Sequence, residues 1–341
     1  MNREEEIKEI PKEQFEPAPI DHEGAERLEK PQLSFMKDAW LRVRKNKAAI
    51  VSLIILALVV LMAIIGPHLS GHDGYAQDVS KSNLPPRVPV LENMGIFDGT
   101  QKIGGEEVNK YEQMNIEEYY WFGTDSLGRD LFTRVWLGTR VSLYIAVLAA
   151  AIDMLVGVIY GLVSGFKGGR TDNVMQRILE VISGIPNLIV VILMLLILKP
   201  GIMSITIAMV ITGWIGMARV VRGQVLKLKD QEYILASRTL GAKNNRLLFK
   251  HLLPNLSGVI IINTMFTIPS AIFFEAFLSF IGIGLQAPAA SLGTLIEDGY
   301  KTFQFLPHLM IIPCILICVI LIVCNLIGDG LRDAFDPKMR D

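Results

Sequence analysis

Long apolar runs recur along the 341-residue chain, and short polar segments separate them. Six runs reach roughly the 20 residues that an α-helix needs to cross about 30 Å of hydrocarbon. Pro186 and Pro269 interrupt two of them, where neighbouring helices can satisfy the freed carbonyl group. The pattern predicts an all-α integral membrane protein with six transmembrane helices. The runs are Ala48–Gly66, Val141–Val163, Ile178–Leu198, Ile202–Val221, Ser257–Ile281 and Pro307–Ile327.

Three glycines in the second run, Gly157, Gly161 and Gly165, recur at four-residue spacing. Such spacing places them on one face of a helix, where the missing side chains let a neighbouring helix approach closely. We therefore expect tight helix packing along this face.

Basic residues predict the orientation of the chain. Five basic residues and one acid lie between Lys37 and Lys47, and the segment Arg219–His251 carries eight Lys or Arg residues. The positive-inside bias places both segments in the cytoplasm, and six spans then return the carboxyl terminus to that side. Arg129 and Arg134 fall on the predicted outer side, but long loops escape this bias. Both termini are therefore predicted to be cytoplasmic.

Composition marks the segments outside the spans. Residues 1–30 are rich in Glu, Lys and Pro, which predicts a disordered tail. The segment ending near Trp40 is expected to form an amphipathic helix on the inner leaflet. The connection over 67–139 is too long for a simple loop and predicts a small extracytoplasmic subdomain. The predicted organisation is a disordered cytoplasmic tail over 1–30, an amphipathic segment over 31–47, the first transmembrane helix over 48–66, an insertion over 67–139, a core of five transmembrane helices over 140–328 with a cytoplasmic loop over 222–256, and a cytoplasmic tail over 329–341.

Two carboxylates inside the apolar runs are candidates for function, because ionisable groups are costly to place in a membrane. Asp153 lies about mid-span, where it either lines an aqueous path or hydrogen-bonds to a neighbouring helix. Glu275 lies toward the outer end of the fifth run. It either helps to gate the path or pairs with Arg140, and the pairing is favoured.

A second candidate group precedes the second span. Asp125, Arg129, Asp130 and Arg134 have the spacing of an interfacial helix, since Asp130 and Arg134 are four residues apart and can pair across one turn. Together with Arg140 they either brace an outer gate, meet an external protein, or form a purely structural network. Pairing would also explain why basic residues lie on the predicted outer side.

Other chemistry is sparse. The chain has no phosphate-binding Gly-x-x-x-x-Gly-Lys-Ser/Thr motif, no metal-ligand spacing and no Ser-His-Asp arrangement, so we expect no bound cofactor or metal and no ATP hydrolysis. The net charge of −1 offers no argument for nucleic acid. An intramembrane enzyme is disfavoured because no polar motif surrounds the carboxylates, and an ion channel because no filter-like loop is present.

The basic loop over 222–256 has its own predicted structure. Asp230 is a good amino-terminal cap, so a helix is expected to begin there and to end at Gly241, where glycine supplies a left-handed conformation. Leu247–Leu253 predict a second amphipathic helix, which Pro254 closes. Small residues on the first helix suit insertion into a groove of another protein, although an ordinary linker is the alternative.

The residues of this loop resemble the "EAA" loop of ABC-importer permeases. The matching stretches are Ala236-Ser237-Arg238, Gly241-Ala242 and His251-Leu252-Leu253-Pro254-Asn255. In that family the first helix, the coupling helix, sits in a groove of the ATP-hydrolysing subunit. This chain departs from the pattern with Leu235 in place of Glu and Ser237 in place of the second Ala. The resemblance implies ATPase-coupling residues Leu235, Ala236, Ser237, Arg238, Leu240, Gly241 and Ala242, with His251, Pro254 and Asn255 supporting the loop.

Three further stretches narrow the resemblance to the C-type permease subunit of dipeptide and oligopeptide importers, in the peptide/nickel family. They are "FGTDSLGRDLFTRVWLGTRVSL" at Phe122–Leu143, "FFEAFLSFIGIGL" at Phe273–Leu285 and "GDGLRDAFDP" at Gly328–Pro337. The likeness runs from Trp40 to the end of the chain, and the interior of the long outer loop lies outside it.

The resemblance implies an ABC type I importer permease fold with an extracytoplasmic insertion between helices 1 and 2, in the bacterial cell membrane. The implied partners are a homologous B-type permease, two cytoplasmic ATPase subunits that bind ATP and Mg, an extracytoplasmic peptide-binding protein and the lipid bilayer, without nucleic acid. The expected cargo is a peptide, with oligopeptides favoured over dipeptides, glutathione or nickel.

Overall fold

The computed structural model describes residues 35–89, 91–95, 97–103, 106–198 and 201–335. The described residues from Ala39 onward belong to one compact unit, and the boundary with the preceding chain lies between Asp38 and Ala39. The predicted tail over 1–30 lies outside the described residues, as does the end of the predicted tail over 329–341. The amphipathic segment over 31–47 is helical where it is described, in α2, Phe35–Lys45.

Five helical stretches within the described residues are long and apolar enough to cross a membrane. The sixth candidate is a broken pair, α6 and α7, bent by 77° between Ser183 and Asn187. Pro186 lies in this break. Proline interrupts a helix here because it lacks an amide proton and restricts the residue before it. The bent pair consists of α6 Gly169–Ser183 and α7 Asn187–Leu198. Two of the five stretches are single helices, α5 Leu131–Lys167 and α14 His308–Phe335. The other three are composite: α3 Lys47–Ile65 followed by the 3₁₀ turn Gly66–His68; α8 Ile202–Gly213 followed by α9 Ile215–Leu228; and α11 Asn244–Arg246 followed by the π-helix Leu247–Leu252 and α12 Leu253–Phe280.

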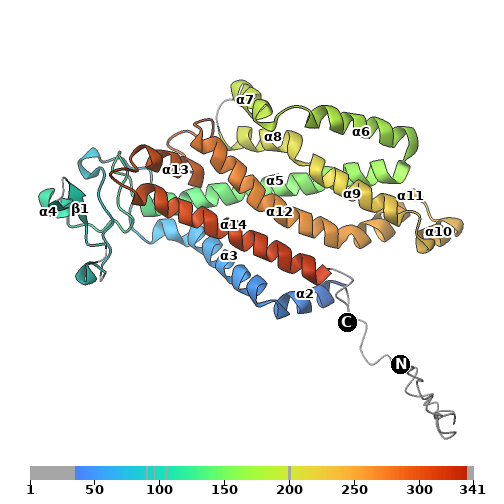
Figure 1. Ribbon diagram of the computed structural model, residues 1–341, viewed down its shortest axis with the longest axis horizontal. Coiled ribbons are helices and arrows are strands. Elements are labelled where there is room, and N and C mark those ends of the chain that lie inside the picture. The colour runs from blue at the N-terminus through green and yellow to red at the C-terminus, as the bar shows by residue number, and fades with distance from the viewer. Residues whose placement is uncertain (1–34, 90, 96, 104–105, 199–200, 336–341) are drawn as a thin grey trace, which may run out of the picture. The chain divides into compact units, whose positions relative to one another are not determined.

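The long helix α5 lies beside α9 and α12 (Figure 1). The glycine face predicted for α5 is the contact with α9. A Cβ atom on Gly161 would lie 2.5 Å from the Ala218 carbonyl oxygen, and one on Gly157 would lie 2.8 Å from the Trp214 carbonyl oxygen. The expected tight packing is therefore confirmed, because the backbones are too close for any side chain at these positions.

Two of the apolar clusters among the described residues bear on the loop at 222–256 and on the long helices. The central cluster joins α3, α5, α7, α8, α12 and α14, and Ile145, Ile205 and Ile320 are fully buried in it. A second one, which we call the α9–α12 cluster, contains Val225, Ile234, Leu247, Leu252 and Leu256. Because Ile234 belongs to a short helix outside the spans, this second cluster attaches the loop at 222–256 to the long helices.

The segment 69–130 between the first span and α5, called the insertion below, has its own small core of Leu84, Tyr111 and Tyr120. Its strands β1 Thr100–Ile103 and β2 Glu106–Asn109 are antiparallel, with Thr100 opposite Asn109. The helix α5 begins at Leu131, earlier than the predicted span start at Val141. The Asp130 side chain caps it by accepting from the Thr133 amide at 2.9 Å. The remaining elements of the insertion are the 3₁₀ turns Val79–Lys81 and Glu92–Met94 and the helix α4 Lys110–Gln113.

Candidate functional site

The short helix α10, Glu232–Thr239, is the core of the loop predicted to couple the chain to a partner. Its one buried side chain is Ile234, which packs among Val225, Leu247 and Leu252 of the α9–α12 cluster. The predicted cap at Asp230 is wrong, since the N-cap residue is Gln231, whose backbone is extended and whose side chain makes no capping bond. Packing of Ile234 therefore fixes where α10 lies.

The carboxyl end of α10 matches the prediction. Gly241 has φ +80°, a left-handed conformation that glycine adopts without strain. The Ala242 amide donates to the Ser237 carbonyl at 3.1 Å and the Gly241 amide to the Arg238 carbonyl at 3.0 Å. This pair of bonds is a Schellman motif, which ends the helix sharply.

Most of the other α10 side chains are exposed, although Arg238 lies over the Phe166 ring of α5 and Tyr233 contacts Asn255. Leu240 is 88% exposed, Leu235 and Ala236 are exposed, and the Ser237 hydroxyl turns back to donate to the Tyr233 carbonyl at 2.8 Å. Two exposed leucines beside small residues form an apolar knob with no partner among the described residues. Exposed apolar groups of this kind mark interaction surfaces.

Pro254 does not end the second half of the loop, contrary to the prediction. The helix continues from Asn244 to Phe280, and Pro254 lies at the junction where the π-helix Leu247–Leu252 passes into α12. The preceding turn is a π-helix, and the side-chain Nδ2 of Asn255 donates to the His251 carbonyl at 2.7 Å and to the Tyr233 hydroxyl at 3.3 Å. Asn255 thus ties α10 to this continuous helix.

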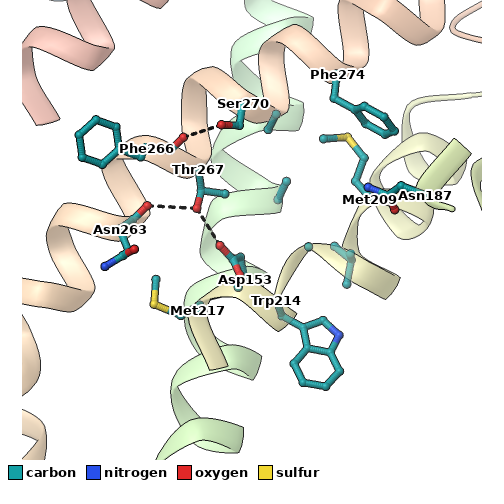
Figure 2. Close-up of a pocket in the computed structure, with 15 residues that line it drawn as sticks. Asp153, Asn187, Met209, Trp214, Met217, Asn263, Phe266, Thr267, Ser270 and Phe274 are labelled. Carbon is teal, nitrogen blue, oxygen red and sulfur yellow. Dashed lines mark hydrogen bonds between the residues drawn. The ribbon is translucent and has the colours of Figure 1, made fainter. Parts of the chain in front are cut away.

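A cavity of about 340 Å³ lies between α5, α8, α9 and α12. Asp153 points into it from α5, and Figure 2 shows this side chain next to Thr267 of α12. The Thr267 hydroxyl donates to Asp153 Oδ2 at 2.7 Å. Asp153 therefore hydrogen-bonds to a neighbouring helix, as one of the two alternatives foresaw, and it also lines this cavity. The cavity is lined by Ala149, Asp153, Asn187, Met209, Val210, Gly213, Trp214, Gly216, Met217, Asn263, Phe266, Thr267, Ser270, Ala271 and Phe274.

Glu275 is enclosed, and its predicted pairing with Arg140 is wrong. Its carboxylate accepts from the Ser142 hydroxyl at 2.9 Å and from the Ser279 hydroxyl at 2.8 Å, and the residue is fully buried. Arg140 instead donates to the Ala63 and Ile64 carbonyls at 3.0 and 3.2 Å. These carbonyls belong to the last turn of α3, where a cation is favoured by the helix dipole.

Three of the outer signature residues, Asp125, Arg129 and Arg134, gather in one network, but the predicted Asp130–Arg134 pair is wrong. Asp130 is occupied in capping α5, and Asp125 accepts from Arg129 Nε at 2.7 Å and lies 3.5 Å from Arg134 Nε. Both arginines also lie within 4 Å of Asp298, at 3.7 and 3.8 Å. Burial raises the pKa of Asp298, whereas the two arginines lower it.

Two functional-looking residues were missed by sequence reasoning. Asp298 is far from the arginines along the chain, so no spacing could have revealed it. Asp172 of α6 accepts two bonds from Arg222 of α9, both at 2.6 Å, and a third from the Ser164 hydroxyl at 2.5 Å. This clamp joins three helices beside the loop at 222–256. No group of three or more metal-ligating side chains occurs among the described residues.

Two protein-family models match this chain. The family model for the binding-protein-dependent transport system inner membrane component matches residues 157–341. The model for the N-terminal TM domain of oligopeptide transport permease C matches residues 34–86.

The curated relatives are similar over nearly their whole length. The oligopeptide transport system permease protein OppC of Bacillus subtilis is 47% identical over 97% of this chain and 99% of its own length. The dipeptide transport system permease protein DppC of the same organism is 44% identical over 98% of this chain and 96% of its own length. A solved structure of the MetNI methionine ABC transporter covers 60% of this chain at 18% identity, with a TM-score of 0.49. The chain belongs to the family of binding-protein-dependent transport system inner membrane components, in the branch of the OppC and DppC permeases, as the sequence motifs indicated.

Proposed function

We propose that this protein is the C-type permease subunit of an ATP-driven peptide importer, with oligopeptides as the favoured cargo. The names and close identity of the OppC and DppC relatives support this function. The observation that carries the coupling role is α10, a helix whose one buried side chain is Ile234, while its leucines and small residues face outward.

In this proposal the bent pair α6–α7 forms one more span, the third in chain order, which brings the total to six. The fold is that of a type I importer permease. Both termini and the loop at 222–256 are cytoplasmic, and the insertion lies on the outer side of the bacterial membrane. A homologous B-type permease completes the path across the cavity at Asp153, and an external binding protein delivers the peptide.

Two cytoplasmic ATPase subunits hold ATP and Mg and supply the work. Their closure moves the segment Leu235–Leu240 as a rigid knob, and Ile234 passes this movement to the α9–α12 cluster. The helices attached to that cluster then switch between inward-open and outward-open arrangements, which is a two-state mechanical coupling. The Asp172–Arg222 clamp keeps α6 moving together with α9.

The variant Ala236→Arg tests the proposal. A long cation on the exposed face keeps the knob out of a partner's groove, while Ile234 and the membrane helices are untouched. We expect uptake of trialanine by proteoliposomes of the full complex to fall at least about tenfold, because losing a well-packed interface contact costs more than about 1.4 kcal/mol. Stimulation of ATP hydrolysis by the loaded binding protein should be lost with it.

The matched control is Gln113→Arg, which adds the same charge to an exposed position of α4 in the insertion. It should insert into membranes, co-purify with the ATPases and transport like the wild type. Normal uptake and normal stimulated hydrolysis in Ala236→Arg would contradict the assignment of α10 as the coupling helix.

A further inference from the structure

The cavity beside α5 contains a carboxylate whose hydrogen-bonding capacity is half used. Asp153 is only 6% exposed, and its Oδ2 atom accepts from Thr267. Among the described residues, Oδ1 has no hydrogen-bond partner. No Lys, Arg or His occurs among the described side chains that line the cavity. A charge buried in this way requires a cation or several donors to offset its lost hydration.

The surroundings define the kind of cation that fits. Asn263 and Ser270 of α12 add polar atoms to the same cavity (Figure 2). The Ser270 hydroxyl already donates to the Phe266 carbonyl at 2.9 Å. An ammonium group supplies three donors and a positive charge. These features suit a primary amine better than a metal ion, which needs several carboxylate or imidazole ligands.

We propose that Asp153 binds the ammonium group at the free amino terminus of the transported peptide. The inference rests on the proposed function and adds a specificity-determining residue to it. Asp153 Oδ1 receives the ammonium group, Thr267 holds the carboxylate through Oδ2, and the apolar cavity accommodates the first side chain. A free amino terminus is the feature that peptides of different sequence share, so one such contact serves a varied cargo.

The test uses the complete complex in proteoliposomes, with radiolabelled trialanine and N-acetyl-trialanine as probes. The measured quantity is the uptake rate of the free peptide divided by that of the acetylated peptide. Wild type and variants share one binding protein, so its own preference cancels when their ratios are compared. Acetylation removes the charge and two of the donors, and it adds an acetyl group.

Asp153→Asn keeps the size of the side chain and an acceptor for Thr267. We expect it to lower the uptake ratio about tenfold or more, as for the loss of one hydrogen bond to a charged group. Asp153→Glu retains a carboxylate and should recover most trialanine uptake. If uptake of the acetylated peptide is too slow to measure, trialanine uptake in Asp153→Glu compared with Asp153→Asn tests whether a carboxylate is required at this position. Asp78→Asn makes the same chemical change in the insertion and should leave the ratio unchanged.

The remaining outcomes overturn the inference. An unchanged ratio, or an equal loss of both peptides with no recovery in Asp153→Glu, would assign Asp153 to a structural role or to a cation of the neighbouring subunit. If the wild-type complex takes up neither probe although all partners are bound, the proposed peptide-import function itself fails.

Discussion

Asp153 and Glu275 are both buried carboxylates on helices that cross the central cluster, yet the structure treats them differently. Glu275 is fully enclosed, and two serine hydroxyls donate to it. Asp153 has one donor, Thr267, and faces a cavity. A carboxylate with all its partners inside the protein holds helices together. One that keeps an atom unpaired at a cavity is available to a ligand.

The helices around the two acids differ in the same sense. Beside Glu275, a Cβ atom on Gly293 of α13, Leu292–Lys301, would lie 2.5 Å from the Ala276 Cα atom. Gly213 and Gly216 border the cavity at Asp153, and a Cβ atom on either would meet nothing within 4 Å. Close packing leaves Glu275 no room to change partners, whereas Asp153 has space beside it.

The largest expected difference is in stability when each acid becomes leucine. Glu275→Leu leaves the Ser142 and Ser279 hydroxyls buried without their acceptor, which should lower the free energy of unfolding by about 3 kcal/mol. Asp153→Leu removes an incompletely paired charge and should cost about 1 kcal/mol or less. Thermal unfolding of the detergent-purified complex measures both. Equal losses in the two variants would remove the distinction between them.

A finer comparison changes the donors instead of the acids. Ser142→Ala removes a donor from Glu275 and also the acceptor of the Leu292 amide, which lies 3.3 Å away, so we expect a loss of about 2 kcal/mol. Thr267→Val leaves Asp153 beside a cavity that water can enter, so the loss should be about 0.5 kcal/mol. The same unfolding measurement applies. A larger loss for Thr267→Val would mean that Asp153 is the structural acid.

Sequence alone identified both acids but not the difference between them. Apolar runs, the glycine face of α5 and the stop at Gly241 were predictable because each depends on residues that are close along the chain. The Ser142–Glu275 bond joins residues 133 positions apart, and no local pattern encodes it. The same is true of Asp298, which replaces Asp130 as a partner of Arg134.

Errors in the loop at 222–256 have a related cause. Asp230 is a favourable cap by residue type, and Pro254 is a favourable stop, yet neither acts so. Burial of Ile234 sets the start of α10 one residue later, and the helix continues through Pro254 by way of the π-helix that precedes it. Local propensity names the candidates, and tertiary packing chooses among them.

The smallest expected effect concerns an acid that is exposed to water, in contrast to the enclosed Glu275 and to Asp153, which has one donor. Glu118 of the insertion accepts from Lys81 Nζ at 2.5 Å, and this bond holds its pKa below the ordinary value of 4.5. The pair therefore stabilises the insertion above that value, and the gain is lost as pH falls through the lowered pKa of the folded state. Both side chains are partly exposed to water, so the effect should stay below about 1 kcal/mol. Hydrogen exchange of the amides near Lys81 should accelerate slightly more between pH 7 and pH 3.5 in the wild type than in Glu118→Gln, after correction for intrinsic rates. Identical acceleration in the two proteins would show that water already outcompetes this pair, and only the buried acids would then remain to be compared.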